Sequence, residues 1–145
     1  MNAGFALDPR LAADTHPIAQ WPLCDVLLMD DARYPWLILV PRVAGARELI
    51  DLDEATRMQL RKETDAASEC LRNAMTPDKL NVAALGNVVD QLHVHVIARY
   101  REDDAWPKPV WGVHPATPRS DEARKAIIDR IHGACPLFAF EENQA

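Results

Sequence analysis

Two histidines separated by one residue are the side chains of this sequence best placed for chemistry. They lie in the stretch Gln91-Leu92-His93-Val94-His95-Val96-Ile97. Side chains of a β-strand alternate between its two faces, so a strand here places Gln91, His93 and His95 in one row, about 6.5–7 Å apart. Two imidazoles and one amide at this spacing can surround a single tetrahedral group, such as a phosphate.

A neutral imidazole is a good nucleophile near pH 7, because its unperturbed pKa is about 6.5. His93 could attack phosphorus and form a phosphoramidate, while His95 donates to a phosphate oxygen or assists the leaving group. The spacing alone leaves three interpretations open: structural or surface histidines, a metal site, or catalysis. A metal site needs a third ligand, and no pattern points to His16, His114 or His132 as that ligand.

The elements that must position these residues can be predicted from the apolar pattern. Strands are predicted at 24–29, 36–40, 79–85 and 92–99, with a polar turn that makes the first two an antiparallel hairpin. Helical spacing predicts a long helix at 53–75 and a last helix from Asp121 to Ile131 or His132. The predicted fold class is α+β: an antiparallel sheet with the long helix packed on one face and a C-terminal helix.

Prolines concentrate in the first 41 residues and between Pro107 and Pro136, and we expect loops or strand edges there. The segment 100–114 carries Trp106 and Trp111. Packing is their simplest role; bordering a pocket or a dimer contact is the alternative.

Length and charge limit the classes of partner. With 145 residues, 48% of them hydrophobic, the chain is expected to form one domain, residues 1–145. A formal net charge of −6 argues against binding a nucleic acid polymer, but it is compatible with a single nucleotide in a pocket. No apolar run is long enough to span a bilayer, and residues 1–10 lack the pattern of a secretory signal. We therefore expect no membrane partner and a cytoplasmic location.

The three cysteines, Cys24, Cys70 and Cys135, lie far apart and form no CxxC pair. Neither a zinc knuckle nor a dithiol redox motif is indicated. We expect buried or idle thiols.

The segment Gln91–Arg99 resembles the histidine triad (HIT) motif, His-φ-His-φ-His-φ-φ with φ apolar, except that Gln91 replaces the first histidine. The order of the surrounding features is also similar to that of the family. An asparagine stands about ten residues before the motif (Asn81), and Gly86-Asn87 stands just before it. A strand, an acidic turn, a strand ending in Val-Pro and a long helix come earlier. The resemblance covers roughly residues 22–100 and leaves about 101–145 as a C-terminal extension.

The resemblance implies a HIT-like fold and a nucleotide-conjugate hydrolase or nucleotidyl transferase that acts at the α-phosphate. His93 matches the covalent nucleophile and His95 the histidine that contacts the transferred phosphate. The implied substrates are dinucleoside polyphosphates or nucleoside phosphoramidates. No cofactor and no resident metal are expected, and members of these branches are commonly homodimers.

The resemblance also assigns the neighbouring polar residues. Asp30 matches the position that hydrogen-bonds the ribose hydroxyls, and Asn81 and Asn87 match positions near the phosphate and the leaving group. Gln91 can donate and accept hydrogen bonds, but it cannot become positively charged. If that position only orients the nucleophile, Gln91 can serve; if it supplies charge, activity is weakened.

Two alternatives to an enzyme therefore stay open. The first is a catalytically weak nucleotide-binding or sensing module, which the loss of the first histidine would produce. The second is a metal-binding protein that uses His93 and His95.

Overall fold

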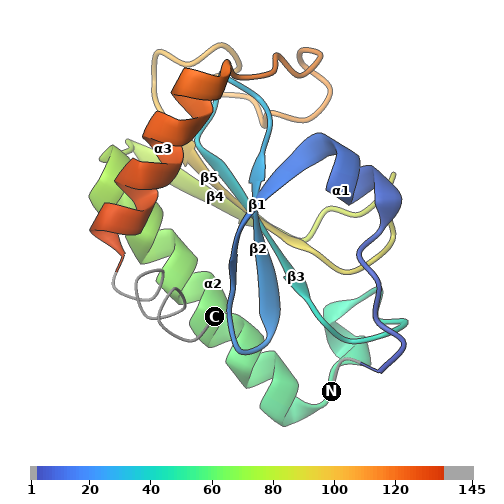
Figure 1. The fold of residues 1–145 in the computed structure, drawn as a ribbon. Helices are drawn as coiled ribbons and strands as arrows, with labels where there is room; N and C mark the ends of the chain where they lie inside the picture. The colour runs from blue at the N-terminus through green and yellow to red at the C-terminus, as the bar shows by residue number, and fades with distance from the viewer. Residues whose placement is uncertain (1–2, 136–145) are drawn as a thin grey trace.

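The computed structural model describes residues 3–135, which form an antiparallel sheet with helices on both sides (Figure 1). The five strands stand in the order β1-β2-β3-β5-β4, and every neighbouring pair is antiparallel. The strands are β1 (Thr15–Gln20), β2 (Cys24–Met29), β3 (Trp36–Pro41), β4 (Lys79–Ala83) and β5 (Val94–Arg99). The helices are α1 (Pro9–Asp14), the 3-10 turn η1 (Leu49–Asp51), α2 (Glu54–Met75) and α3 (Asp121–Ala134). The predicted α+β class is confirmed.

One face of the sheet packs against α2 and α3, which lie side by side (Figure 1). Val94 and Val96 of β5 point into this core, as their even positions predict, and they meet Leu71 of α2 and Ile131 of α3 in one buried cluster. Burial of these side chains is the main source of stability on this face.

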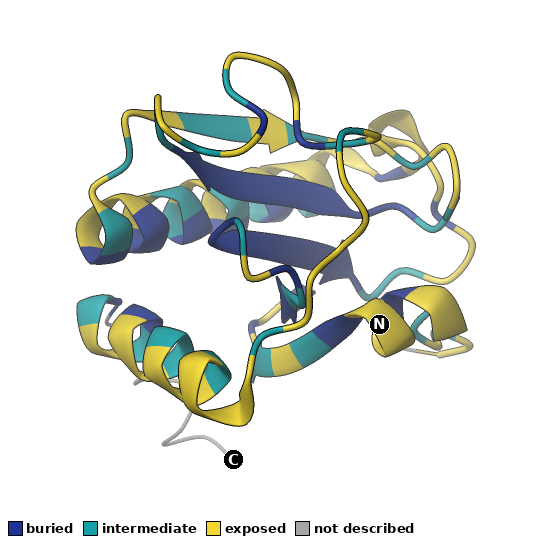
Figure 2. Cartoon of the chain, turned by 90° about the horizontal axis from the view of Figure 1, so that it is seen from above, coloured by how far each residue is buried: buried dark blue, intermediate teal, exposed yellow. Residues whose placement is uncertain are grey.

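The opposite face is covered by α1 and by the segment that follows β5. A second core there contains Leu11 of α1, Ile38 of β3, Ile97 of β5 and Val110 of the covering segment. The central strands β3 and β5 are consequently buried on both faces, whereas the edge strands β1 and β4 are only partly buried (Figure 2). His95 lies on this second face, among side chains shielded from water.

The long helix begins and ends as its sequence predicts. The side chain of Asp53 accepts a hydrogen bond from the backbone N–H of Thr56 at 2.8 Å and caps the first turn. At the other end Thr76 takes a left-handed conformation (φ 47°), and Pro77 follows it. A proline cannot continue the helix, so α2 stops there.

Two predicted strands are shorter in the structure. The predicted strand 92–99 begins at Val94, because the backbone N–H of Leu92 donates to the carbonyl of Ala46 instead of to a neighbouring strand. The predicted strand 79–85 ends at Ala83, which pairs with His95 near the start of β5. His93 therefore precedes the strand, and His95 lies within it.

The proline-rich N-terminal region contains two elements that the apolar pattern did not reveal. Pro9 stands in the first turn of α1, where the missing N–H costs nothing, and the side chain of Asp8 caps the helix. Pro17 lies on the edge strand β1 beside an irregularity in its pairing with β2, a position that tolerates proline. The last helix extends to Ala134, beyond the predicted end. Residues 136–145 of the predicted C-terminal extension lie outside the described residues.

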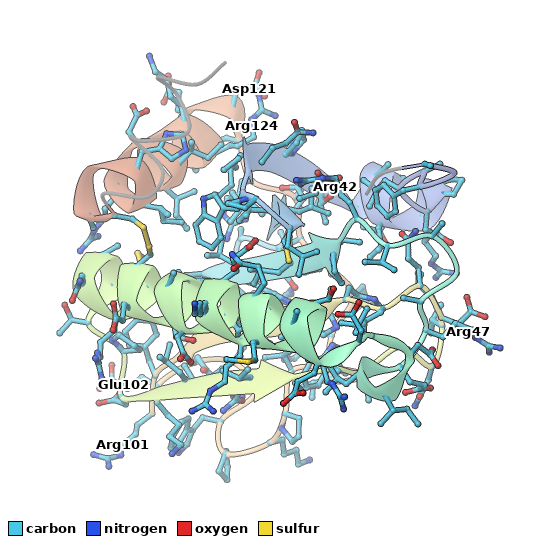
Figure 3. All side chains as sticks on the ribbon, turned by 90° about the horizontal axis from the view of Figure 1, so that it is seen from below. Arg42, Arg47, Arg101, Glu102, Asp121 and Arg124 are labelled. Atoms are coloured by element: carbon cyan, nitrogen blue, oxygen red, sulfur yellow. A yellow bond between two sulfur atoms is a disulfide. The ribbon has the colours of Figure 1, made fainter. Side chains whose placement is uncertain are left out.

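The expectation of idle thiols is wrong for two of the three cysteines. Cys70 of α2 and Cys135, directly after α3, form a disulfide with their Cα atoms 5.0 Å apart (yellow bond in Figure 3). The packing of α3 against α2 brings them together, which spacing along the chain could not indicate. Cys24 is free and buried.

Within residues 3–135, no helix has the length and apolar character needed to cross a membrane.

Candidate active site

The ring of His93 is held in one orientation by the main chain beside it. Its Nδ1 lies 2.6 Å from the carbonyl oxygen of Gln91. A carbonyl can only accept a hydrogen bond, so Nδ1 carries the proton and Nε2 keeps its lone pair. Among the described residues none is hydrogen-bonded to Nε2. The nitrogen suited to nucleophilic attack is thus the one that the protein leaves open.

His95 is fixed in the opposite tautomer by two partners. The indole Nε1 of Trp36 lies 3.0 Å from His95 Nδ1, and an indole N–H only donates. His95 Nε2 lies 3.2 Å from the carbonyl oxygen of Leu85 and must therefore donate its proton to it. Both bonds are satisfied by a neutral ring that has its N–H at Nε2.

Burial keeps the His95 ring neutral. Desolvation, followed by the nearby His93, lowers the pKa of His95 from 6.5 to about 4, against the opposing effect of the Leu85 carbonyl. At neutral pH His95 is therefore a neutral hydrogen-bond donor and carries no positive charge.

Aromatic rings enclose the histidine pair. The His93 and His95 rings are 4.8 Å apart and meet edge to face. The ring centre of His95 lies 5.0 Å from that of Trp111 and 5.6 Å from that of Trp36. The ring centres of the two tryptophans are 6.0 Å apart. Edge-to-face packing of this kind restricts the rotation of His95 and preserves its hydrogen bonds.

An apolar pocket of about 390 Å³ opens on one side of the histidines. Its walls come from α1, from the sheet, from the loop between β4 and β5, and from Trp111. Apolar side chains of Leu11, Met29, Ile38, Leu85, Val88 and Val89 line most of it, with Arg10, Asp14 and Asn87 as polar members. Its size and its mainly apolar walls suit a flat heterocycle such as a nucleobase.

A smaller, polar pocket of about 130 Å³ lies on the other side of His93. Gly86, Asn87, Gln91 and Arg47 are among the residues that line it, and the Arg47 guanidinium pairs with Asp90 at 3.2 Å. Arg47 reaches outward at the rim of the molecule (Figure 3). A Cβ on Gly86 would lie 2.7 Å from the carbonyl oxygen of Val89, so only glycine fits this turn beside His93.

A family model described as the HIT domain matches residues 10–102 of this chain. This chain belongs to the histidine triad (HIT) family. A histidine triad protein from Bradyrhizobium japonicum is 46% identical to it, with a TM-score of 0.88 over 90% of this chain and 98% of that chain. A histidine triad protein from Marinobacter aquaeolei VT8 is 47% identical, with a TM-score of 0.89 over 94% of this chain and 98% of that chain. No curated protein matches the chain significantly.

A hypothetical histidine triad nucleotide-binding protein from Sulfolobus tokodaii is only 18% identical. Its TM-score is 0.63, and the match covers 83% of each chain. At this identity the likeness concerns the fold alone.

In this HIT protein the side chain at the first triad position is hydrogen-bonded to a different segment from the other two. The side chain of Gln91 is hydrogen-bonded to the backbone of Ala6 and Asp8 in the N-terminal segment. Its main-chain carbonyl, by contrast, contacts His93. The side-chain amide of Gln91 is thus engaged by the N-terminal segment, and both Gln91 and His93 precede β5, which begins at Val94.

The three polar residues predicted for nucleotide binding lie in different places. Asn87 borders both pockets together with His93. Asn81 lies on β4 and accepts a hydrogen bond from the buried Arg99 at 2.8 Å. Asp30 follows the pocket residue Met29, but its carboxylate is already engaged.

Two groups hold the Asp30 carboxylate. It accepts a hydrogen bond from the Arg119 backbone N–H at 2.9 Å and lies 3.4 Å from His16 Nε2. Although partial burial raises its pKa, these contacts prevail and the pKa of Asp30 is lowered. Neither Asp30 nor Asn81 lines the two pockets described above, so their contact with a nucleotide stays a prediction.

Sequence reasoning missed several groups that the fold places at the site. Trp36 looks like an ordinary core residue of a strand, and its partner His95 is 59 positions away. Arg10 and Leu11 reach the pocket through α1, a helix too short for a periodic pattern, although Asp8-Pro9 is a typical helix start. Trp111 borders the apolar pocket, which is one of the two roles that the sequence left open for it.

Proposed function

We propose that this HIT protein is a nucleotide-conjugate hydrolase or nucleotidyl transferase that acts at the α-phosphate through a covalent nucleotidyl–His93 intermediate. The observation that carries this proposal is the pair of opposite tautomers. His93 offers a lone pair at Nε2, and His95, with its ring 4.8 Å away, offers an N–H at Nε2. One ring can attack phosphorus while the other donates to a phosphate oxygen.

The reaction has two balanced steps. The lone pair of His93 Nε2 forms a bond to the α-phosphorus, and the bond from phosphorus to the leaving group breaks, with its electron pair going to that group. Water or another acceptor then attacks phosphorus and releases a proton to solvent, and the P–N pair returns to Nε2. The Gln91 carbonyl holds the Nδ1 proton and stabilises the positive charge that the ring carries in between.

The two pockets support a substrate that binds across His93, with its two parts in different pockets. The apolar pocket fits the nucleoside, and the polar pocket beside Gly86 and Asn87 fits the leaving group. Dinucleoside polyphosphates and nucleoside phosphoramidates are the proposed substrates. The Sulfolobus tokodaii protein, whose likeness to this chain is one of fold, is described as nucleotide-binding.

A metal-binding function has less support from the donor set. Three of the four ring nitrogens of His93 and His95 already hydrogen-bond to protein groups. Within residues 3–135, no cluster of three or more histidine, cysteine or acidic side chains could hold a metal ion. We propose that the reaction needs no cofactor.

The test combines turnover with detection of the intermediate. The chain is incubated with adenosine and guanosine conjugates, quenched in alkaline denaturant because P–N bonds hydrolyse in acid, and analysed by mass spectrometry for a nucleotidyl adduct on His93. We expect His93→Ala to lose the adduct and to lower kcat by roughly a thousandfold or more, with its folding intact. His114→Ala, an exposed histidine away from the pockets, is the matched control and should keep full activity.

Each other outcome has a definite meaning. Full activity of His93→Ala on every conjugate would overturn the mechanism. Binding of a mononucleotide by the wild-type chain, with neither turnover nor adduct, would favour the binding or sensing module. Stoichiometric metal in protein purified without a His tag would favour the metal-binding function.

We also propose that the chain forms a homodimer through α2 and the edge of β4. A groove of about 700 Å³ lies there, with the apolar side chains of Leu49, Met58 and Val82 partly exposed in it. Arg57 and Glu54 line the same groove, so charges of both signs are available to a two-fold copy. β4 is an edge strand and invites pairing with another chain. Light scattering should give a dimer for the wild-type chain and a monomer for Val82→Lys.

A further inference from the structure

The side chain of Gln91 holds the N-terminal segment in the manner of a neighbouring strand. Its Nε2 donates to the carbonyl oxygen of Ala6, and its Oε1 accepts from the backbone N–H of Asp8, both at 2.9 Å. A primary amide presents a donor and an acceptor side by side, as a peptide group does, so one side chain satisfies two backbone groups. Gln91 is separated along the chain from Asp8 by 83 residues and from Ala6 by 85 residues.

The segment that Gln91 holds leads directly into a wall of the apolar pocket. Asp8 caps α1 by accepting from the backbone N–H of Arg10 at 2.8 Å. From α1, Arg10, Leu11 and Asp14 line the pocket that contains His93 and His95. With six residues, α1 cannot be stable alone and depends on such attachments.

The far end of α1 has its own attachment. The carbonyl of Asp14 accepts from the backbone N–H of Asp30 at 3.0 Å, and Leu11 is buried in the second core. The near end has the cap of Asp8 and the two bonds of Gln91. Gln91, just before β5, is therefore the motif residue whose side chain fixes the start of this wall.

We propose that Gln91 is a positioning residue that fastens the N-terminal segment as a wall of the nucleotide pocket, and that its side chain makes no contact with the transferred phosphate. Its main chain and side chain divide the work: the carbonyl orients His93, and the amide orients α1. The kinetic readout of this inference rests on the proposed function, whereas its structural readout does not.

The proposal explains why glutamine suits this position better than the histidine of the motif. The two nitrogens of an imidazole point away from each other, so the ring cannot bond both Ala6 and Asp8 as the amide does. A Gln91→His exchange completes the three-histidine motif, yet it removes at least one of these bonds. The backbone carbonyl that orients His93 is unaffected, because it belongs to the main chain.

The experiment compares Gln91→His and Gln91→Ala with the wild-type chain. We measure kcat and KM on the conjugates that are turned over, the Kd of AMP, and hydrogen exchange of the Asp8 amide. We expect KM and Kd to rise about 5- to 10-fold, kcat to change less than about twofold, and exchange at Asp8 to accelerate by a similar factor. Gln20→His makes the same substitution at an exposed strand residue outside the pockets. It should change neither the kinetic constants, nor the Kd of AMP, nor hydrogen exchange at Asp8.

A chain that lacks residues 2–7 tests the same connection from the other side. It should show a rise in KM and Kd of the same order, and adding Gln91→Ala to it should contribute less than about twofold more, because the Ala6 partner is gone and, of the two bonds, the one to Asp8 alone is left to lose.

The opposite results are equally clear. A Gln91→His variant with raised kcat, or a Gln91→Ala variant with kcat lowered tenfold at unchanged KM, would place the side chain at the reacting phosphate. Unchanged binding and unchanged exchange at Asp8 would also overturn the proposal. If the wild-type chain neither turns over conjugates nor binds AMP, the proposed function fails, and hydrogen exchange at Asp8 still decides whether Gln91 fastens the segment.

Discussion

The two faces of the sheet are built by different means. The face under α2 and α3 is mainly a cluster of aliphatic side chains such as Leu71, Val94 and Val96, brought together by apolar burial, with Glu63 as a buried carboxylate at its side. The face under α1 and the segment after β5 buries His93, His95 and Arg99 as well, each with hydrogen-bonded partners. Strands β3 and β5 contribute to both faces (Figure 2).

This difference teaches where such a fold can place chemistry. Apolar burial has no direction, so a regular helix can supply it along one stripe. A buried imidazole needs donors and acceptors at defined positions. Two of these come from irregular segments, Leu85 in a loop and Gln91 before β5, and the third is Trp36 at the first position of β3. The face covered by loops is therefore the face that can hold a reactive pair.

The largest effect on stability is expected from a substitution in the core under α2 and α3, which leaves the histidine face unchanged. Leu71→Ala removes a fully buried side chain from the α2 core and should lower the free energy of unfolding by about 3 kcal/mol. Urea unfolding measures the loss. Lys62→Ala, at an exposed position on the same helix, is the control. Because Leu71 lies across the sheet from the histidines, kcat of the folded fraction should not change; a large fall in kcat would show that the two faces are not separable.

The second prediction concerns the site face and pH. The pKa of His95 is about 4 in the folded chain and about 6.5 when unfolded, so between these values the unfolded state binds the proton first. The contribution of His95 to the free energy of unfolding is therefore fully present above pH 6.5. It is lost as the pH falls toward 4, and the loss amounts to up to about 3 kcal/mol. Urea unfolding at pH 7.5, 6, 5 and 4.5 should show this slope. His95→Gln should flatten it and His114→Gln should not; an equal slope in all three chains would contradict the assignment.

The smallest expected effect tests one hydrogen bond. Trp36→Phe keeps an aromatic ring but removes the N–H that His95 Nδ1 accepts. We expect kcat to fall about 5- to 10-fold, equivalent to about 1 kcal/mol, and the free energy of unfolding to fall by about 1–2 kcal/mol, because the smaller ring leaves space and His95 Nδ1 loses its donor. Nitrogen NMR shifts of His95 should show a mixture of tautomers in place of the Nε2–H form. An unchanged tautomer would mean that the Leu85 carbonyl is sufficient to hold it.

The sequence predicted the regular elements and the reactive pair because their evidence is local. The alternation in residues 92–99 separates the apolar positions that face α2 from those that carry the histidines. Asp53 and Pro77 mark the two ends of α2. The motif around His93 and His95 indicated the family. Each of these features is contained in residues a few positions apart, where spacing along the chain reports spacing in the fold.

The tertiary structure alone decided what the side chains of the site touch. Gln91 and Asp8 are 83 residues apart, Trp36 and His95 are 59 apart, and the bonded cysteines are 65 apart. No local period records such pairs, because they depend on how the strands and helices are stacked. The sequence by itself thus determined that two neighbouring histidines lie at one strand of an antiparallel sheet. Only the folded chain decided which nitrogen of each ring is protonated, and that the first position of the motif, Gln91, is used to hold the N-terminal segment.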